Sequence, residues 1–400
     1  MAWKIYVLFV CVLCLRFILA ARENYIKATF EGAKDRGIFN KLVVNRETNE
    51  LYLAAVNHLY KLSPNLEVIQ EVVTGPHLDD PSCTSLTNLT CDPDLKSCAC
   101  KLRPYYTKAL VVDYVNKKLI TCSTLYHGHC DKLDLDNITN KQMFPFMPMV
   151  ANNATASTVM FIAPGPAVVK DEPQRQVLYV AASYTRTGLK AYREQVPAFC
   201  SRSLEDFNLL LKNAFGSSSI EIESQHRDTF PVRYIYGFGS DNFSYVLSIQ
   251  KANVQTDRYV TKISRICQSD DDYYSYAEVG LSCTMQNTEF NLLQAAYVGK
   301  SGTKLARSLG IPTTEDVLYT VFSIGDSNSA NPSATSAMCV YSLRDIRKKF
   351  TENIQECFSG IGNTGPDHMI QSSKCLKVVS SHFFVIFFLE SFESADLSVL

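Results

Sequence analysis

The fold of this chain is indicated most directly by the phrase Leu51-Tyr52-Leu53-Ala54-Ala55, which Leu59-Tyr60-Lys61-Leu62 follows after a short gap. Leu42-Val43-Val44 precedes both segments. Each segment is short, apolar and rich in β-branched or aromatic residues, and Asn, Gly, Ser or Pro residues bound it. This composition is typical of β-strands separated by turns. Residues 42–62 therefore predict one small antiparallel sheet.

The same phrase recurs along the chain, less regularly toward its end. Leu110-Val111-Val112 and Leu119-Ile120-Thr121-Cys122 repeat it, and further units are expected at 159–182, 234–266 and 292–343. These five units have roughly 60 residues each, against about 40 to 50 in common propeller repeats. Because a small sheet cannot bury its own face, the repetition predicts a propeller or a solenoid. A two-sheet sandwich of many short strands is the alternative.

The amino-terminal end and the composition indicate a secreted chain. Lys4, the apolar run from Ile5 to Leu15 and the small residues near Ala20 predict a secretory signal peptide over residues 1–21. The net charge is −1 and no basic block is present, which argues against a nucleic-acid partner. The repeats stop near Lys377, so we expect residues 378–400 to form a divergent tail with no assigned fold.

Cysteines and glycosylation sequons support an oxidising, extracellular compartment. The chain has fourteen cysteines, of which Cys11 and Cys14 lie in the predicted signal peptide. Cys122 and Cys130 flank a seven-residue stretch that predicts a hairpin, which would place them on neighbouring strands. Four Asn-x-Ser/Thr sequons lie in polar, turn-like stretches and predict glycosylation at Asn88, Asn137, Asn153 and Asn242.

No motif indicates an enzyme, a cofactor or a metal site. His127-x-His129-Cys130 has metal-binding residue types, but Cys130 is better explained as half of a hairpin disulfide. Asp270-Asp271-Asp272 lacks the ligand spacing of a calcium loop. Gly237-Phe238-Gly239 lacks the third glycine of a dinucleotide loop, and we expect it to form a turn between strands.

One helix is expected near the end of the repeats. Its apolar face comprises residues at three- and four-residue steps, namely Leu343, Ile346, Phe350, Ile354 and Phe358. Basic residues populate the other faces. They would either bind an acidic partner or lie in water on the rim of the propeller, and the pattern favours the second interpretation.

Several longer stretches occur in an order that matches a known family. They are Phe39–Val44, Ala55–Ser63, Thr74–Pro76, Leu125–Cys130, Tyr274–Val279, Leu318–Ser323 and Ala337–Leu343. Over residues 30–377 they resemble the amino-terminal sema domain of plexins. This resemblance implies an all-β, sema-type propeller of four-stranded antiparallel blades, seven in the family and about five here, so that the domain is incomplete.

The resemblance also implies a function. The sema domain of plexins is the extracellular ligand-binding part of a cell-surface receptor for semaphorins, which signal in axon guidance and cell migration. A co-receptor or a second copy of the receptor would be a further partner. The membrane and cytoplasmic signalling parts are absent here, so we expect an incomplete gene model or a secreted decoy fragment. The sema domain of a hepatocyte growth factor receptor-like protein is the alternative family.

For the cysteines, the family pattern implies four disulfide bonds: Cys83–Cys91, Cys122–Cys130, Cys283–Cys339 and Cys357–Cys375. Cys267 is expected to remain unpaired, and an exposed thiol there would invite a bond to another chain. The family gives no pairing for Cys98, Cys100 and Cys200, and one hypothesis joins Cys200 to either of the other two. Neither the residues nor the resemblance indicates which side chains contact the ligand.

Overall fold

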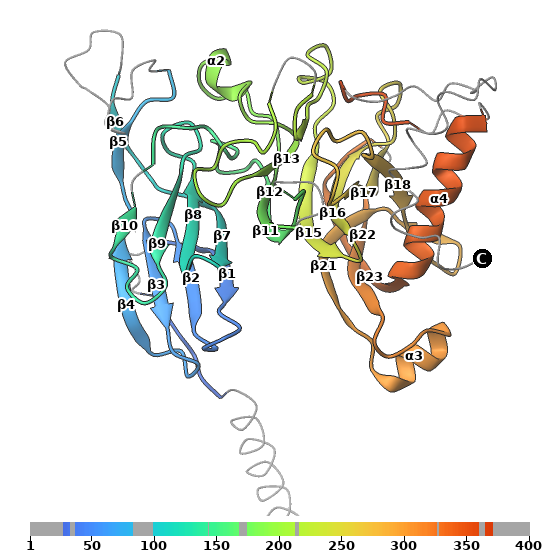
Figure 1. Ribbon diagram of the computed structural model, residues 1–400, viewed down its shortest axis with the longest axis horizontal. Coiled ribbons are helices and arrows are strands. Elements are labelled where there is room, and N and C mark those ends of the chain that lie inside the picture. The colour runs from blue at the N-terminus through green and yellow to red at the C-terminus, as the bar shows by residue number, and fades with distance from the viewer. Residues whose placement is uncertain are drawn as a thin grey trace, which may run out of the picture.

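The computed structural model describes residues 27–32, 37–82, 99–142, 144–167, 174–212, 216–325, 328–359 and 365–370. The predicted signal peptide and the predicted tail lie outside these residues. Within the described ranges the chain is built almost entirely from antiparallel strands (Figure 1).

Five sheets follow one another along the chain, and each is built from consecutive strands. The first four sheets have four strands and the fifth has three among the described residues. Their strands are, in chain order, β1 (Phe39–Val44), β2 (Leu51–Ala55), β3 (His58–Leu62) and β4 (Val68–Val73); β7 (Thr107–Asp113), β8 (Lys118–Ser123), β9 (Cys130–Asp134) and β10 (Lys141–Gln142); β11 (Thr158–Pro164), β12 (Gln176–Ala182), β13 (Phe199–Arg202) and β14 (Ser219–Ile220); β15 (Arg233–Ser240), β16 (Phe243–Lys251), β17 (Tyr259–Cys267) and β18 (Ala277–Leu281); and β21 (Leu292–Lys300), β22 (Asp316–Gly325) and β23 (Pro332–Ser342).

The remaining elements decorate these sheets. Two short ribbons pair β5 (His77–Asp79) with β6 (Lys101–Arg103) and β19 (Cys283–Met285) with β20 (Thr288–Phe290). Three helices are described, namely α2 (Lys190–Arg193), α3 (Thr303–Leu309) and α4 (Leu343–Ser359).

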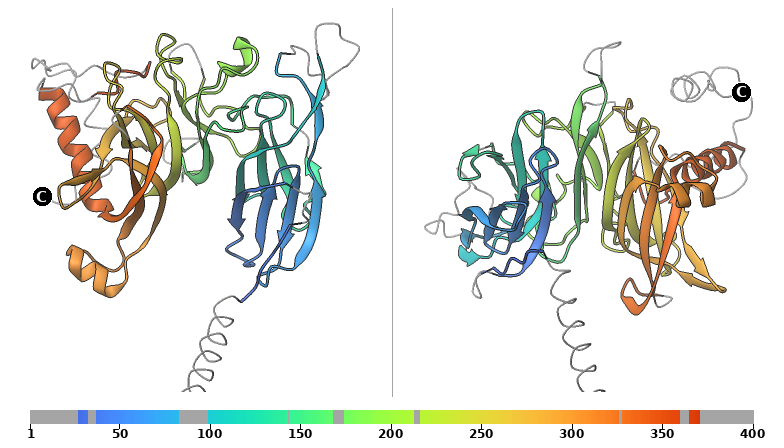
Figure 2. Two further views of the ribbon diagram at one scale, coloured as in Figure 1. Left: turned by 180° about the vertical axis from the view of Figure 1, so that it is seen from behind. Right: turned by 90° about the horizontal axis from the view of Figure 1, so that it is seen from below.

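The sheets are arranged as the blades of a propeller. The first strand of each sheet contacts the first strand of the next, in the order β1, β7, β11, β15 and β21. The later strands of every sheet follow outward from that inner strand, and Figure 2 shows the sheets fanning side by side. The five predicted units and the propeller arrangement are therefore confirmed, and the sandwich is excluded.

Burial on both faces explains why the central strands read as continuous apolar runs. In β12, Leu178 and Val180 pack in the core between the second and third sheets. Tyr179 and Ala181 point to the opposite face and pack between the third and fourth sheets. Alternate residues of a strand face opposite sides of its sheet, so a blade with neighbours on both sides needs apolar residues at every position.

Four of the five inner strands contain β-bulges. The register shifts between Phe39 and Lys41 in β1, and similar shifts occur early in β7, β15 and β21. A bulge bends a strand and increases its twist, which suits strands that converge on a common axis.

The expected turn at Gly237-Phe238-Gly239 is wrong, because these residues lie inside β15. A Cβ atom at Gly237 would lie 2.5 Å from the ring of Phe161 in β11, and one at Gly239 would lie 2.7 Å from Cβ of Ala163. The two glycines are there because β11 and β15 approach closely, and not because the chain reverses.

The predicted helix is confirmed as α4, which lies beside the fourth and fifth sheets (Figure 1). Leu343, Ile346 and Phe350 are buried in the core that these sheets share, and Ile354 packs against it. Three of the basic residues form ion pairs, namely Arg344 with Glu315 (2.6 Å), Arg347 with Asp241 (2.8 Å) and Lys349 with Glu352 (3.4 Å). The side chain of Phe358 lies outside the described set.

Candidate ligand-binding surface

Among the described residues, two disulfide bonds join strands of the propeller. Cys122 of β8 and Cys130 of β9 are register partners in the second sheet, and their sulfur atoms are bonded. Cys283 of β19 is bonded to Cys339 of β23, which ties the β19–β20 ribbon to the fifth sheet. A disulfide bond of this kind typically stabilises a fold by about 2–4 kcal/mol.

Two thiols among the described residues are free and buried, and this corrects one expectation. Cys200 is free and lies in the core between the second and third sheets, so the hypothesis that joined it to Cys98 or Cys100 is wrong. Cys267 is free, as expected, and because only 7% of it is exposed, it is not placed to bond to another chain. Burial raises the pKa of both thiols and so disfavours the reactive thiolate.

The other cysteines are only partly described. Cys100 and Cys357 are each disulfide-bonded. Cys83, Cys91, Cys98 and Cys375 lie outside the described residues, so the pairs Cys83–Cys91 and Cys357–Cys375 stay predictions.

Three of the four sequons are described, and their surroundings differ. Asn137 lies in the turn between β9 and β10, where its Nδ2 donates to Oδ1 of Asn140 (3.4 Å). Asn153 follows the second sheet, and its Nδ2 donates to Oγ1 of Thr187 (3.2 Å). Asn242 is exposed at the tip of the β15–β16 hairpin. Asn88 lies outside the described residues.

The two motifs with metal-like residue types have structural surroundings. The imidazole of His127 lies 4.3 Å from the ring of Tyr192, centroid to centroid, and Cys130 is occupied by its disulfide bond. Asp270 accepts hydrogen bonds from the backbone N–H groups of Asp272 and Ser275, as a turn residue does. No group of three metal-ligating side chains occurs in the described part of the chain.

A buried polar cluster that the sequence did not indicate lies at the fourth sheet. The carboxylate of Glu278 in β18 is 1% exposed and accepts hydrogen bonds from Tyr276 (2.6 Å), Gln250 (2.9 Å) and Lys262 (3.1 Å). Although burial alone would raise its pKa, Lys262, His368 and the Tyr276 hydroxyl lower the pKa of Glu278 to about 2. Glu278 is therefore a fixed anion in the core.

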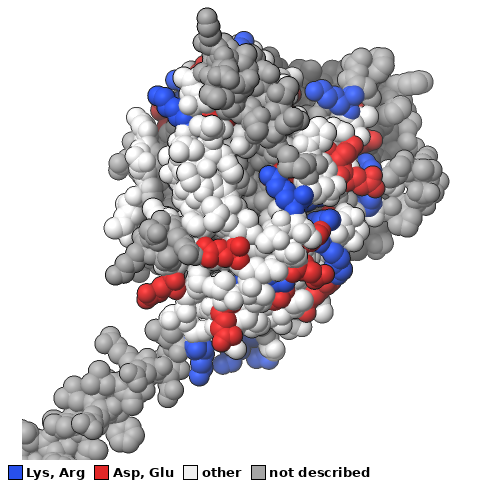
Figure 3. Space-filling view, turned by 90° about the vertical axis from the view of Figure 1, so that its left-hand side faces the viewer, with Lys and Arg blue, Asp and Glu red and all other residues white. Residues whose placement is uncertain are grey.

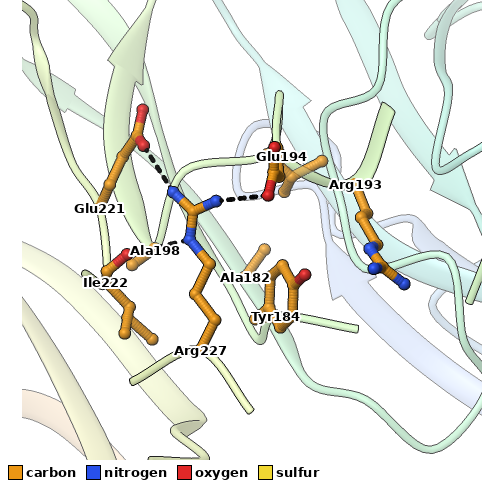
Figure 4. Close-up of a pocket in the computed structure, with 9 residues that line it drawn as sticks. Ala182, Tyr184, Arg193, Glu194, Ala198, Glu221, Ile222 and Arg227 are labelled. Carbon is orange, nitrogen blue, oxygen red and sulfur yellow. Dashed lines mark hydrogen bonds and ion pairs between the residues drawn. The ribbon is translucent and has the colours of Figure 1, made fainter. Parts of the chain in front are cut away.

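Loops beside the third sheet form a recess around Arg227 (Figure 4). The Arg227 guanidinium donates to both Glu194 and Glu221 at 3.0 Å, and its Nε donates to the carbonyl oxygen of Ile222 at 3.0 Å. Three acceptors therefore fix its orientation. We call this feature the Arg227 recess; its lining also includes Ala182, Tyr184, Arg193, Val196 and Ala198.

Tyr184 is the aromatic centre of the Arg227 recess. The Cζ atoms of Arg193 and Arg227 lie 5.8 Å and 5.9 Å from its ring centroid, within the range of cation–π attraction. Arg193 also donates from Nη1 to the carbonyl oxygen of Arg186 (2.9 Å). The recess thus presents arginine and tyrosine side chains on a preorganised framework.

A second, larger hollow adjoins the recess and shares Tyr184 and Arg227 with it. We call it the Tyr259 groove; it has a volume of about 320 Å³ and is open to solvent. Its wall includes Thr155, Ser157, Arg186, Asp228, Arg233 and Tyr259. Arg186 is paired with Asp228 (2.7 Å), whereas Arg233 is exposed at the start of β15.

A different face of the molecule, beside β4 to β6, is mostly uncharged with acidic and basic residues interspersed (Figure 3). The large apolar side chains that are exposed on these strands are Val68, Ile69, Val73, Leu78 and Leu102. Apolar side chains on an edge strand invite contact with another protein. No helix within the described ranges is both long and apolar enough to cross a bilayer.

Comparison with known proteins identifies this architecture. Residues 293–382 match the model of the Sema domain family. Mouse Plexin-A3 is 32% identical over 80% of this chain, and zebrafish Plexin-A4 is 33% identical over 86% of it. The full extracellular region of plexin A4 superposes with a TM-score of 0.73 at 30% identity, over 86% of this chain and 38% of that one. This chain carries a plexin-type sema domain.

The match covers only part of the length of each plexin relative. The chain spans less than a fifth of the length of these plexin relatives, 17% of mouse Plexin-A3 and 19% of zebrafish Plexin-A4. Drosophila Semaphorin 2a shares the fold, with a TM-score of 0.50 at 11% identity over 81% of this chain. The plexin-type sema domain that the sequence indicated is therefore confirmed, together with its propeller fold.

Proposed function

We propose that this plexin-type sema domain is an extracellular, non-catalytic module that binds a semaphorin. The observation that carries the proposal is the match to the extracellular region of plexin A4, at 30% identity and a TM-score of 0.73 over 86% of this chain. In a complete receptor, this binding would initiate guidance and migration signals across the membrane. The stacked, doubly covered sheets supply a rigid support on which loop residues can be held for a protein partner.

The Arg227 recess is our candidate for part of the semaphorin contact. Arginine and tyrosine are enriched among the residues that dominate protein–protein binding energy. Arg227 is held by three acceptors, and Arg193 and Tyr184 lie beside it with partly exposed side chains. A partner would therefore meet side chains that lose little conformational freedom on binding.

Charge reversal tests this assignment. Arg193→Glu should weaken binding of a purified semaphorin ectodomain by about tenfold or more, because truncation of a dominant contact costs about 2 kcal/mol or more. Lys304→Glu is the matched control, since Lys304 is exposed on α3, away from α2 and the recess (Figure 1). Surface plasmon resonance on the secreted chain would measure both. Equal affinities for the two variants would remove the recess from the contact, and no binding of any semaphorin by the folded chain would remove the function.

A further inference from the structure

We infer that the Tyr259 groove holds the first sugars of an N-linked glycan carried by Asn153. This inference does not depend on semaphorin binding. It joins two observations, the position of the sequon Asn153-Ala154-Thr155 and the chemistry of the hollow that begins directly after it.

The sequon lies at the end of the groove. Thr155, Ala156 and Ser157 follow Asn153 and form part of the groove wall. The Nδ2 atom of Asn153 lies 3.2 Å from Oγ1 of Thr187, and the neighbouring Arg186 is another part of the wall. The atom that would carry the sugar is therefore located between two segments that line the groove.

The Asn153 side chain is already held in one orientation. Its Oδ1 accepts hydrogen bonds from the backbone N–H and the hydroxyl of Thr155, at 2.9 Å and 2.8 Å. Its Nδ2 has two hydrogens, of which one is donated to Thr187. A glycosidic bond replaces one hydrogen and leaves the other, so the contact with Thr187 can persist and fix the direction of the sugar.

Attachment is a group transfer from a lipid pyrophosphate-linked oligosaccharide in the secretory pathway. A bond forms between Nδ2 and C1 of the first N-acetylglucosamine, the bond from C1 to the pyrophosphate oxygen breaks, and one amide proton is released. The lipid pyrophosphate leaves with the electron pair of the broken bond. The added group is uncharged, so it introduces no charge into the groove.

The groove wall suits a sugar with hydroxyl and acetamide groups. Tyr259 provides aromatic surface for a C–H face of the ring, and Arg186 and Arg233 provide N–H donors for its oxygens. A volume of about 320 Å³ lies at the lower end of the roughly 300–1,000 Å³ typical of pockets for small ligands. An apolar wall with a few polar groups is the usual composition of such a site.

The other described sequons lie outside the groove and serve as internal references, although Oδ1 of Asn137 accepts the same two hydrogen bonds from Thr139. Asn242 is exposed at a hairpin tip, with φ of 63° at that residue. Asn137 lies in a short turn. Neither residue is part of the wall of the Tyr259 groove. Glycans at these positions should therefore extend into solvent.

The test measures how fast each glycan is removed from the folded protein. The full chain is secreted from animal cells and treated, without denaturant, with an amidase that cleaves between asparagine and the first sugar. Glycopeptide mass spectrometry then follows each site over time. We expect release from Asn153 to be about tenfold or more slower than from Asn242 or Asn137, because the groove must first open. Denaturation should abolish the difference.

A variant of the wall separates protection by the groove from a general effect of folding. Tyr259→Ser should accelerate release at Asn153 several-fold and leave the reference sites unchanged. Tyr274→Ser is the matched control, because Tyr274 is 63% exposed and is not part of the groove wall. The inference is overturned if Asn153 carries no glycan or if the native protein releases glycans from all three sites at equal rates. It is also overturned if Tyr259→Ser does not change the release rate at Asn153.

Discussion

His368 lies against Glu278 with Nε2 of the imidazole 3.6 Å from Oε1 of the carboxylate, and both side chains are buried. The imidazole stacks on Phe230 at 4.0 Å between centroids. His368 belongs to the segment 365–370, whose backbone bonds to Glu221 and Glu223 beyond β14. A residue far along the chain thus reaches the interface between the third and fourth sheets.

This placement makes the stability of the fold sensitive to acid. Burial lowers the pKa of His368 from 6.5, Lys262 and His226 lower it further, and Glu278 and Asp367 oppose them. The unfolded chain therefore binds a proton at a higher pH than the folded chain does. Stability is fully present above pH 6.5 and falls as the pH decreases below that value.

Removal of the titrating group should flatten this dependence. His368→Phe keeps an aromatic ring on Phe230, and we expect its melting temperature to change less between pH 7.5 and pH 5 than that of the native chain. His77→Gln is the control, because His77 is exposed in β5 and is not among the groups that shift the pKa of His368. Differential scanning fluorimetry across that range measures all three proteins. Parallel pH profiles for the native chain and His368→Phe would exclude this role.

Glu278 should be far more important to stability than exposed carboxylates. Glu278→Gln leaves Lys262 partly buried without its anion, and we expect a loss of about 3 kcal/mol in the free energy of unfolding. Glu289→Gln removes a surface partner of Arg258 and should cost less than about 1 kcal/mol. Urea unfolding followed by fluorescence gives both values. Similar losses for the two variants would show that Glu278 is not an essential anion of the core.

Because β11 and β15 approach closely, we expect that Gly237 cannot be replaced by a larger residue without loss of stability. Gly237→Ala should destabilise the chain by about 1–3 kcal/mol, since its Cβ would overlap the Phe161 ring. Gly280→Ala is matched to it, because a Cβ at that position in β18 meets nothing within 4 Å. We expect the control to unfold within about 0.5 kcal/mol of the native chain. Equal destabilisation in urea titrations would contradict the close packing of these inner strands.

The two buried thiols should be inaccessible until the chain unfolds. In native protein without reductant, Cys200 and Cys267 should resist alkylation by iodoacetamide, whereas in denaturant both should react. Cys122 and Cys283 should remain unmodified in either condition because they are disulfide-bonded. Peptide mass spectrometry distinguishes these sites. Rapid labelling of Cys200 in the native chain would show that the core between the second and third sheets is open.

The sequence predicts those parts of the fold that depend on local periodicity and on contiguous motifs. The strand phrases around Leu53 and Leu110 and the apolar face of α4 appear in the structure as expected, because strand and helix patterning depends on neighbouring residues. Gly237 was misread, since a glycine signals either a turn or a close backbone approach, and only the position of Phe161 decides between them.

The candidate site was beyond what a single sequence can indicate. Tyr184 and Glu194 lie between β12 and β13 and Arg227 lies between β14 and β15, and no spacing rule links them. His368 and Glu278 are ninety positions apart, and the contact between them exists only because the segment 365–370 bonds back near β14. The free state of Cys200 likewise follows from its burial between two sheets, which the cysteine spacing does not show.

The claim that a semaphorin docks on this propeller at the Arg227 recess is tested most directly by hydrogen–deuterium exchange of the chain with and without a purified semaphorin ectodomain. We predict slower exchange in the peptides that contain Tyr184, Arg193 and Arg227, and unchanged exchange in α3. Unchanged exchange throughout the chain at saturating semaphorin, or protection confined to α3 and the fifth sheet, would contradict the account.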